Sequence, residues 1–492
     1  MSIWSDKHTS IIAGVSMASA KKITMKLLVD KERSRVVYAE ADKDFVDILF
    51  SFLTLPLGTI VKVLNKQSTL GCMDNLYESV EKLDIRYLQT EACKSMLLHP
   101  RSEAAVRCEY LKINIDDTKP RDVYVCKKFC STQPFLFSSA QNAQCIHCKE
   151  KMDMVLTCEE DDSVKLFVKE GVKYVISNDL RVEPATVRHM LYLLQKMDIK
   201  DGSVLEEGFM DISEQEILAL LKRMLVSEMP LTDLYFHQND KTDAATRDHV
   251  GKKEAAQVLV KTESNQETNS TEGISITLLI NKHKNKVLCA EADDNFLNIL
   301  FTFLTLPLGS LIKILNKNTG TGCVDNLYRS AEDLSLEYIE SEQSRSILLS
   351  PQLGPFFGCS NNILKLDEIN PRYGCYSCFL KNANCDHDVV GTSVMKGLNP
   401  KSLQGGTEKG GGYAKGPGKF MVTDDLRVSP LSTISIVSKL DSSFDNVVER
   451  KVIIGEIQVL NLLRAAITSK TPLTDVFSPC QNPRNWSRYS LD

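Results

Sequence analysis

The stretch AEADKDFVDILFSFLTLPLG at residues 39–58 returns almost unchanged as AEADDNFLNILFTFLTLPLG at residues 290–309, 251 positions further along a chain of 492. The similarity continues to GCMDNLY (71–77) and GCVDNLY (322–328), so that 25 of 39 aligned positions are identical. Similarity at one fixed offset indicates that a structural unit has been duplicated.

Two later blocks extend the duplication over most of the chain. KYVISNDLRVEP (173–184) matches KFMVTDDLRVSP (419–430), and PLTDLYF (230–236) matches PLTDVFS (472–478). Because the order is the same in both halves, we predict repeat copy one at 21–237 and repeat copy two at 273–480. Residues 238–272 are polar and nearly free of aromatic side chains, which is typical of a flexible linker. Residues 1–20 form an N-terminal extension and residues 481–492 a C-terminal tail.

Each copy is predicted to combine strands and helices. In copy one we expect strands at 26–30, 35–40, 111–115, 165–168 and 173–176, and helices at 42–54, 74–83, 90–98, 185–195 and 213–226. The last helix opens with Ser213 and Glu216, the spacing of a capping box. Because these elements do not alternate strictly, they favour an α+β class with two tandem homologous domains, each a small mixed sheet packed with helices. The apolar block 49–57, which contains Phe52, is expected to pack on its own sheet.

Composition limits the class of protein. Apolar residues make up 43% and charged residues 25%, which excludes fibrous and wholly disordered chains. The net charge of −5, from 59 basic and 64 acidic residues, gives no basic field for nucleic acid. The longest apolar runs, 48–61 and 299–312, contain a proline and are too short for a membrane span. Fifteen cysteines are too few for a disulfide scaffold, so we expect a reducing compartment, the cytoplasm or the nucleus.

The sequence KLLVDKERSRVVYAEADKDFVDILFSFLTLPLGTIVKVL (26–64), its partial repetition in copy two and the two later blocks resemble a plant-specific family known as domain of unknown function 674. The resemblance covers most of residues 21–480. It implies a plant source and a duplicated layout, and it carries no catalytic residues over to this chain.

A cysteine cluster in copy one is the best candidate for a functional site. Two close pairs, Cys126-x₃-Cys130 and Cys145-x₂-Cys148, are separated by fourteen residues. Each pair can supply two ligands from one turn, which is the arrangement of a tetrahedral zinc-ribbon-like loop. Four thiolates would close the coordination shell around a structural ion. The alternative is a set of unliganded loop thiols.

Copy two carries a shorter version of this cluster. Cys375-x₂-Cys378 precedes Cys385-x-His387, and Asp388 stands where copy one has Cys148. We expect Cys375, Cys378, Cys385 and His387 to bind a second zinc ion. Cys108 and Cys359 lie outside both clusters, also 251 positions apart, and are alternative ligands.

Catalytic patterns are scarce. Cys72 and Cys323 stand in matching GC-x-DNLY contexts, but a nucleophilic thiol needs a base, and we interpret both as buried thiols before a helix. The expected function is therefore a non-enzymatic interaction or scaffold protein that binds other proteins. The second candidate is a zinc-ribbon-type nucleic-acid binder, because Lys127, Lys128, Phe129 and Lys149 flank the cysteines. The third candidate is an enzyme of undetermined class.

Overall fold

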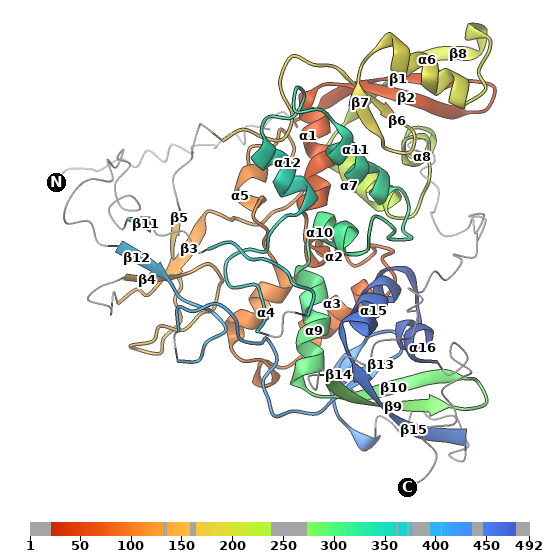
Figure 1. Cartoon of the computed structure of the whole chain (residues 1–492). Helices are drawn as coiled ribbons and strands as arrows, with labels where there is room; N and C mark the ends of the chain where they lie inside the picture. Colours follow the sequence, from red (N-terminus) through yellow and green to blue (C-terminus); the bar gives the residue numbers. More distant parts are fainter. Residues whose placement is uncertain are drawn as a thin grey trace, which may run out of the picture.

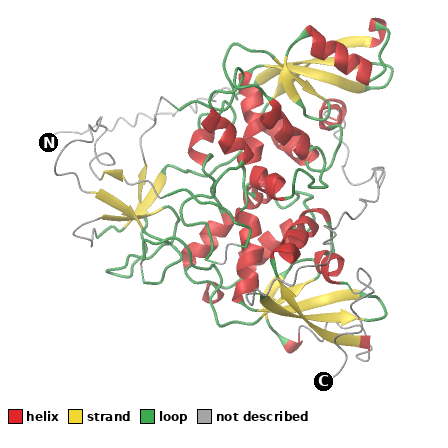
Figure 2. Ribbon diagram, in the orientation of Figure 1, coloured by secondary structure: helices red, strands yellow, loops and turns green. Residues whose placement is uncertain are grey.

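The computed structural model describes residues 21–128, 130, 135–157, 164–237, 273–360, 363–370, 374–375, 394–404, 406–434 and 446–478. Three β-sheets lie at three corners of the molecule, and helices fill the space between them (Figures 1 and 2). The fold is therefore of the mixed α+β class. The predicted linker 238–272 and both predicted terminal extensions lie outside the described residues.

The first half of the chain supplies the elements β1 to β8 and α1 to α8. The strands are β1 (Ile23–Asp30), β2 (Arg35–Ala41), β3 (Asp122–Val125), β4 (Phe135–Ser138), β5 (Met154–Thr157), β6 (Tyr174–Ser177), β7 (Val182–Pro184) and β8 (Leu205–Ile212). The helices are α1 (Lys43–Ser51), η1 (Phe52–Thr54), α2 (Leu57–Val63), α3 (Met73–Lys82), η2 (Ile85–Tyr87), α4 (Glu91–Leu98), α5 (Ala105–Cys108), α6 (Val187–Lys196), η3 (Gly202–Val204), α7 (Glu214–Met224) and α8 (Pro230–His237).

The second half repeats much of this order. Its strands are β9 (Ile274–Asn281), β10 (Lys286–Ala292), β11 (Gly374–Cys375), β12 (Val394–Gly397), β13 (Phe420–Thr423), β14 (Val428–Pro430) and β15 (Val447–Ile454). Its helices are α9 (Asp294–Thr305), α10 (Leu308–Ile314), α11 (Val324–Asp333), α12 (Glu342–Leu349), α15 (Glu456–Thr468) and α16 (Pro472–Phe477).

Two of the sheets have the same strand order. The first is β7-β6-β2-β1-β8 and the second is β14-β13-β10-β9-β15, and every neighbouring pair in both is antiparallel. β1 and β9 alternate buried and more exposed side chains along their first residues, as strands with one face on the core do. The third sheet, β11-β12-β4-β3-β5, takes strands from both halves, and its β12–β4 pair is parallel.

Helices α3 and α11 each pack against the sheet of the other half of the chain, so the two halves exchange these helices. Helix α3 of the first half contacts β14 and α9, whereas α11 of the second half contacts β7 and α1 (Figure 1). One continuous hydrophobic cluster therefore includes apolar side chains from both halves, among them Phe52 and Phe303, which are both fully buried. We expected block 49–57 to pack only on the sheet of its own half. Instead, η1, which belongs to this block, also contacts α10 and α12 of the other half.

Local predictions are confirmed at one helix cap and wrong at two expected strands. Ser213 and Glu216 form the expected capping box of α7. The strands expected at 111–115 and 165–168 are wrong, because neither range contains a strand. In the second range the amides of Phe167 and Val168 donate to the side chain of Asp47, both at 2.9 Å, instead of to a neighbouring strand. Within the described ranges, no helix combines the length and the apolar character needed to cross a bilayer.

Candidate metal centre

Four cysteines of the first half converge at one end of the third sheet. The Sγ atoms of Cys126 and Cys130 are 3.7 Å apart, and those of Cys126 and Cys148 are 3.6 Å apart. With Cys145 included, all four sulfur atoms lie within 4.8 Å of one another. Sulfur atoms that share a tetrahedral zinc ion at about 2.3 Å lie roughly 4 Å apart, so the group has the dimensions of a metal site.

The local fold explains why the two pairs meet. Cys126 follows β3 directly, and β3 pairs with β4 and β5. The turn after Cys145 is closed by bonds from the Cys145 amide to the Glu150 carbonyl at 2.8 Å and from the Lys149 amide to the Cys145 carbonyl at 2.9 Å. Lys149 adopts a left-handed backbone with φ of 61°, which allows this tight reversal. The second pair is therefore held by backbone geometry.

Backbone amides favour the thiolate form at part of the cluster. The Glu150 amide donates to the sulfur of Cys148 and lowers its pKa. Burial raises the pKa of Cys145, partly offset by the amides of Cys148 and His147. The hydrogen bond with Cys148 raises the pKa of Cys130 to about 12. The thiol of Cys148 thus ionises more readily than those of Cys130 and Cys145, and a bound cation would favour the thiolate form of the cluster.

The charged residues around the cluster are largely paired. Lys127 lies 2.7 Å from Asp153, and Lys128 lies 2.6 Å from Glu150. Phe129, which the nucleic-acid interpretation also used, lies outside the described residues. Two of the three flanking lysines are therefore neutralised locally, which weakens the basic character of this surface.

The cysteine set of the second half is described only in part. Cys375 belongs to β11, where its backbone pairs with Val394 of β12, and its side chain is not described. Cys378, Cys385 and His387 lie outside the described residues. The alternative ligands are elsewhere: the Cys108 sulfur lies 3.7 Å from the Thr54 hydroxyl, and the Cys359 sulfur accepts from Thr302 at 3.5 Å.

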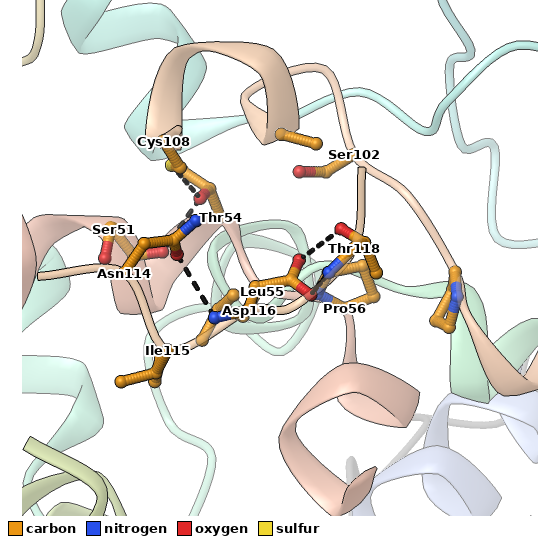
Figure 3. Close-up of a pocket in the computed structure, with 12 residues that line it drawn as sticks. Ser51, Thr54, Leu55, Pro56, Ser102, Cys108, Asn114, Ile115, Asp116 and Thr118 are labelled. Carbon is orange, nitrogen blue, oxygen red and sulfur yellow. Dashed lines mark hydrogen bonds between the residues drawn. The ribbon is translucent and has the colours of Figure 1, made fainter. Parts of the chain in front are cut away.

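A small pocket next to Cys108 also gathers polar side chains (Figure 3). It encloses about 410 Å³ of space between atoms, open solvent included, and hydroxyl groups of Ser51, Thr54, Ser102 and Thr118 are among its lining groups. The Asp116 carboxylate accepts from the amide and hydroxyl of Thr118, at 3.0 and 2.9 Å. Burial raises the pKa of Cys108 to about 12, and no histidine lines the pocket. The Cys108 thiol lies beside the Thr54 hydroxyl, so this lining does not pair a nucleophile with a base.

The paired cysteines Cys72 and Cys323 are buried, as the sequence predicted, and stand at the N-termini of α3 and α11. Burial raises the pKa of Cys72 to about 12, and it also raises the pKa of Cys323. Because a thiolate is the reactive form, neither position has the properties of a nucleophile.

Sequence reasoning missed a buried ionic group in the second half. The Lys401 ammonium donates to the Gly358 carbonyl and lies 5.0 Å from the centre of the Tyr413 ring. The Glu368 carboxylate accepts from the Gly358 amide at 2.6 Å. Burial lowers the pKa of Lys401 and raises that of Glu368. Lys401 lies in a polar, glycine-rich stretch without periodicity, so no sequence signal marked it.

Comparison with known proteins places the chain in a family. No match was found among curated proteins or among solved structures. The family described as "Protein of unknown function (DUF674)" matches residues 19–457, nearly the whole chain. This range contains both copies of the block at 39–77 and 290–328, all three sheets and the four-cysteine group, and the chain therefore belongs to the DUF674 family.

Proposed function

We propose that this chain is a non-enzymatic interaction or scaffold protein whose first half holds a structural zinc ion through Cys126, Cys130, Cys145 and Cys148. The observation that carries the proposal is the convergence of four sulfur atoms within 4.8 Å of one another. Four protein ligands fill a tetrahedral shell and leave no position for a substrate, which is typical of structural zinc. The reducing cytoplasm or nucleus would keep these thiols available.

The place of the cluster in the fold supports a structural role. The four cysteines lie in the connections that join β3 to β4 and β4 to β5, while β11 and β12 of the second half complete the same sheet. The described part of this sheet has a small apolar cluster of its own, formed by Val123, Val125, Phe137 and Met395. A metal ion would stabilise a sheet whose core is this small. The ion would thereby support a platform that both halves share.

The same proposal includes the duplication. Two tandem homologous copies account for the two sheets of identical strand order, and Cys375, Cys378, Cys385 and His387 would form a second zinc site. The second site is expected to bind more weakly, because Asp388 replaces the fourth cysteine.

A protein partner is favoured over nucleic acid by the surface. Helix α6 exposes apolar side chains, with Val187 71% and Leu191 49% exposed, whereas Lys127 and Lys128 are paired with carboxylates. Exposed apolar side chains grouped on one helix are typical of protein-binding surfaces. A nucleic-acid binder would instead show an affinity that falls steeply with salt concentration.

Metal analysis of the full chain tests the proposal. We expect zinc to remain after dialysis without chelator, Cys145→Ser to release the first ion, and Cys385→Ser to leave that ion in place. Cys108→Ala is the matched control, because it removes a buried thiol that lies beside Thr54. A wild-type chain without zinc, or one whose zinc content is unchanged by Cys145→Ser, would contradict the assignment.

A further inference from the structure

We infer that the face each half presents to the other is a self-complementary dimerisation surface, and that its partner is a second copy of the same repeat. In this chain the second copy is supplied by the other half. The inference rests on the contacts between the halves and is independent of the metal. It also gives a role to the FLTLPLG block, which is identical in the two halves.

The centre of the contact is a pair of prolines. Pro56 pairs with Pro307 in an isolated antiparallel bridge, and these residues are equivalent under the offset of 251. On either side, the Leu57 amide donates to the Leu306 carbonyl and the Leu308 amide donates to the Leu55 carbonyl, both at 3.0 Å. The offset of 251 converts each of these two hydrogen bonds into the other. A contact in which a residue meets its own equivalent defines a two-fold, isologous interface.

The same reciprocity extends outward along α3 and α11. The Asn75 amide group donates to the Asp425 carbonyl at 3.0 Å, and that of Asn326 donates to the Asp179 carbonyl at 3.1 Å. The equivalent serines one turn later on these helices, Ser79 and Ser330, accept from the amides of Val428 and Val182, both at 2.9 Å. Each of these bonds joins one half to the other.

Two glycines allow the backbones of the halves to approach closely. Gly71 has φ of +44° and Gly322 has φ of +38°, and they are equivalent under the same offset. A Cβ at Gly71 would overlap the Ala466 carbonyl oxygen, and one at Gly322 would overlap that of Met224. The next amides use the same carbonyls, from Cys72 at 2.7 Å and from Cys323 at 3.0 Å.

This reciprocity explains why the central block changed so little between the halves. In an isologous contact, a residue near the axis packs against its own equivalent, so both copies must remain compatible. Because α3 and α11 each pack on the sheet of the other half, a single repeat would leave this helix face uncovered, and the sheet of a second copy could cover it.

Shortening the linker of the full chain tests whether a second molecule can take this place. α8 and β9 belong to opposite ends of the molecule (Figure 1), and deletion of 241–270 leaves a connection that spans at most about 20 Å. We expect light scattering to give twice the chain mass with an unchanged far-UV spectrum. A folded monomer with the wild-type unfolding midpoint would overturn the inference, and so would a chain that does not fold at any concentration.

A full chain with a protease site inserted between residues 255 and 256 tests the surface itself. After cleavage we expect the two fragments to co-elute without denaturant. Gly71→Ala and Gly322→Ala should each weaken their association by about tenfold or more, since a backbone overlap must be relieved. Gly171→Ala is the matched control: its φ is +80° and nothing lies within 4 Å of the added carbon. Fragments that separate in buffer, or equal effects at Gly71 and Gly171, would refute the inference, while the zinc content reports separately on the metal proposal.

Discussion

Replacement of Asp47 by asparagine is expected to leave the chain almost as stable as before, because the second half already uses an amide at this position. Asp47 is fully buried, and its Oδ1 accepts the amides of Phe167 and Val168, both at 2.9 Å. The equivalent Asn298 accepts two successive amides through its own Oδ1, at 2.7 and 2.9 Å. The carbonyl oxygen of an asparagine can therefore hold both donors of the first half.

The expected magnitudes separate asparagine from alanine. Asp47→Ala leaves two buried amides without an acceptor, at about 1–3 kcal/mol each, so the loss should be about 2–6 kcal/mol. Asp47→Asn keeps both bonds and loses only the 2.5 Å ion pair with Lys43, whose side chain is partly exposed. We expect its free energy of unfolding to lie within about 1 kcal/mol of the wild type, because the lost attraction is offset by the desolvation cost of the buried carboxylate, and Lys43 can reach water.

The pH dependence of stability shows in which direction Asp47→Asn should differ from the wild type. Burial raises the pKa of Asp47, although Lys43 opposes the shift. The folded chain therefore holds this proton more tightly than the unfolded chain, and the associated stability is lost as pH rises through the folded pKa. Asp47→Asn should therefore gain stability relative to the wild type as the pH rises above about 4, where the unfolded carboxyl group ionises first. Urea unfolding followed by circular dichroism measures both effects, and equal losses for the asparagine and alanine variants at pH 7 would refute the reasoning.

Three further outcomes are expected. Phe52→Ala should lower the free energy of unfolding by about 3–5 kcal/mol, since its side chain is fully buried, and a loss below about 1 kcal/mol would contradict that burial. Ser213→Ala should cost about 1 kcal/mol through loss of the α7 cap, whereas Ser213→Gly should cost a few tenths; a thermal melt that ranks the two in the opposite order would contradict this. Lys401→Ala should destabilise the chain by about 1–3 kcal/mol because it leaves the Gly358 carbonyl without the ammonium that donates to it, and unfolding midpoints that match the wild type would count against this contact.

Local periodicity predicted the elements whose contacts are close in sequence. The expected strands at 26–30 and 35–40 are β1 and β2, and the helices expected at 74–83 and 90–98 are α3 and α4. These elements are determined by alternation, by apolar spacing and by caps such as Thr90, whose side chain accepts the Cys93 amide. The spacing of four cysteines likewise predicted which sulfur atoms the structure brings together.

The exchange of helices could not be predicted in the same way. α3 and α11 carry nearly the same sequence, GCMDNLY and GCVDNLY, so each has the residues to pack at either end of the molecule. Only the three-dimensional path of the connecting segments decides between the two arrangements. The strand prediction for 165–168 was wrong for a related reason, because the Phe167 amide bonds to the side chain of Asp47, 120 residues away.

The third sheet shows how the halves differ where a metal is expected. Cys126 directly follows β3, which pairs with β5, and Cys375 belongs to β11, which pairs with β12. The first cysteine of each set therefore lies at or directly after a strand of the same sheet. The β12–β4 contact also ties the strands of the second half to the first cluster, with Met395 opposite Phe135. A metal in the first loop would thus support both strand pairs, and the second half could lose its fourth cysteine without losing its place in the sheet.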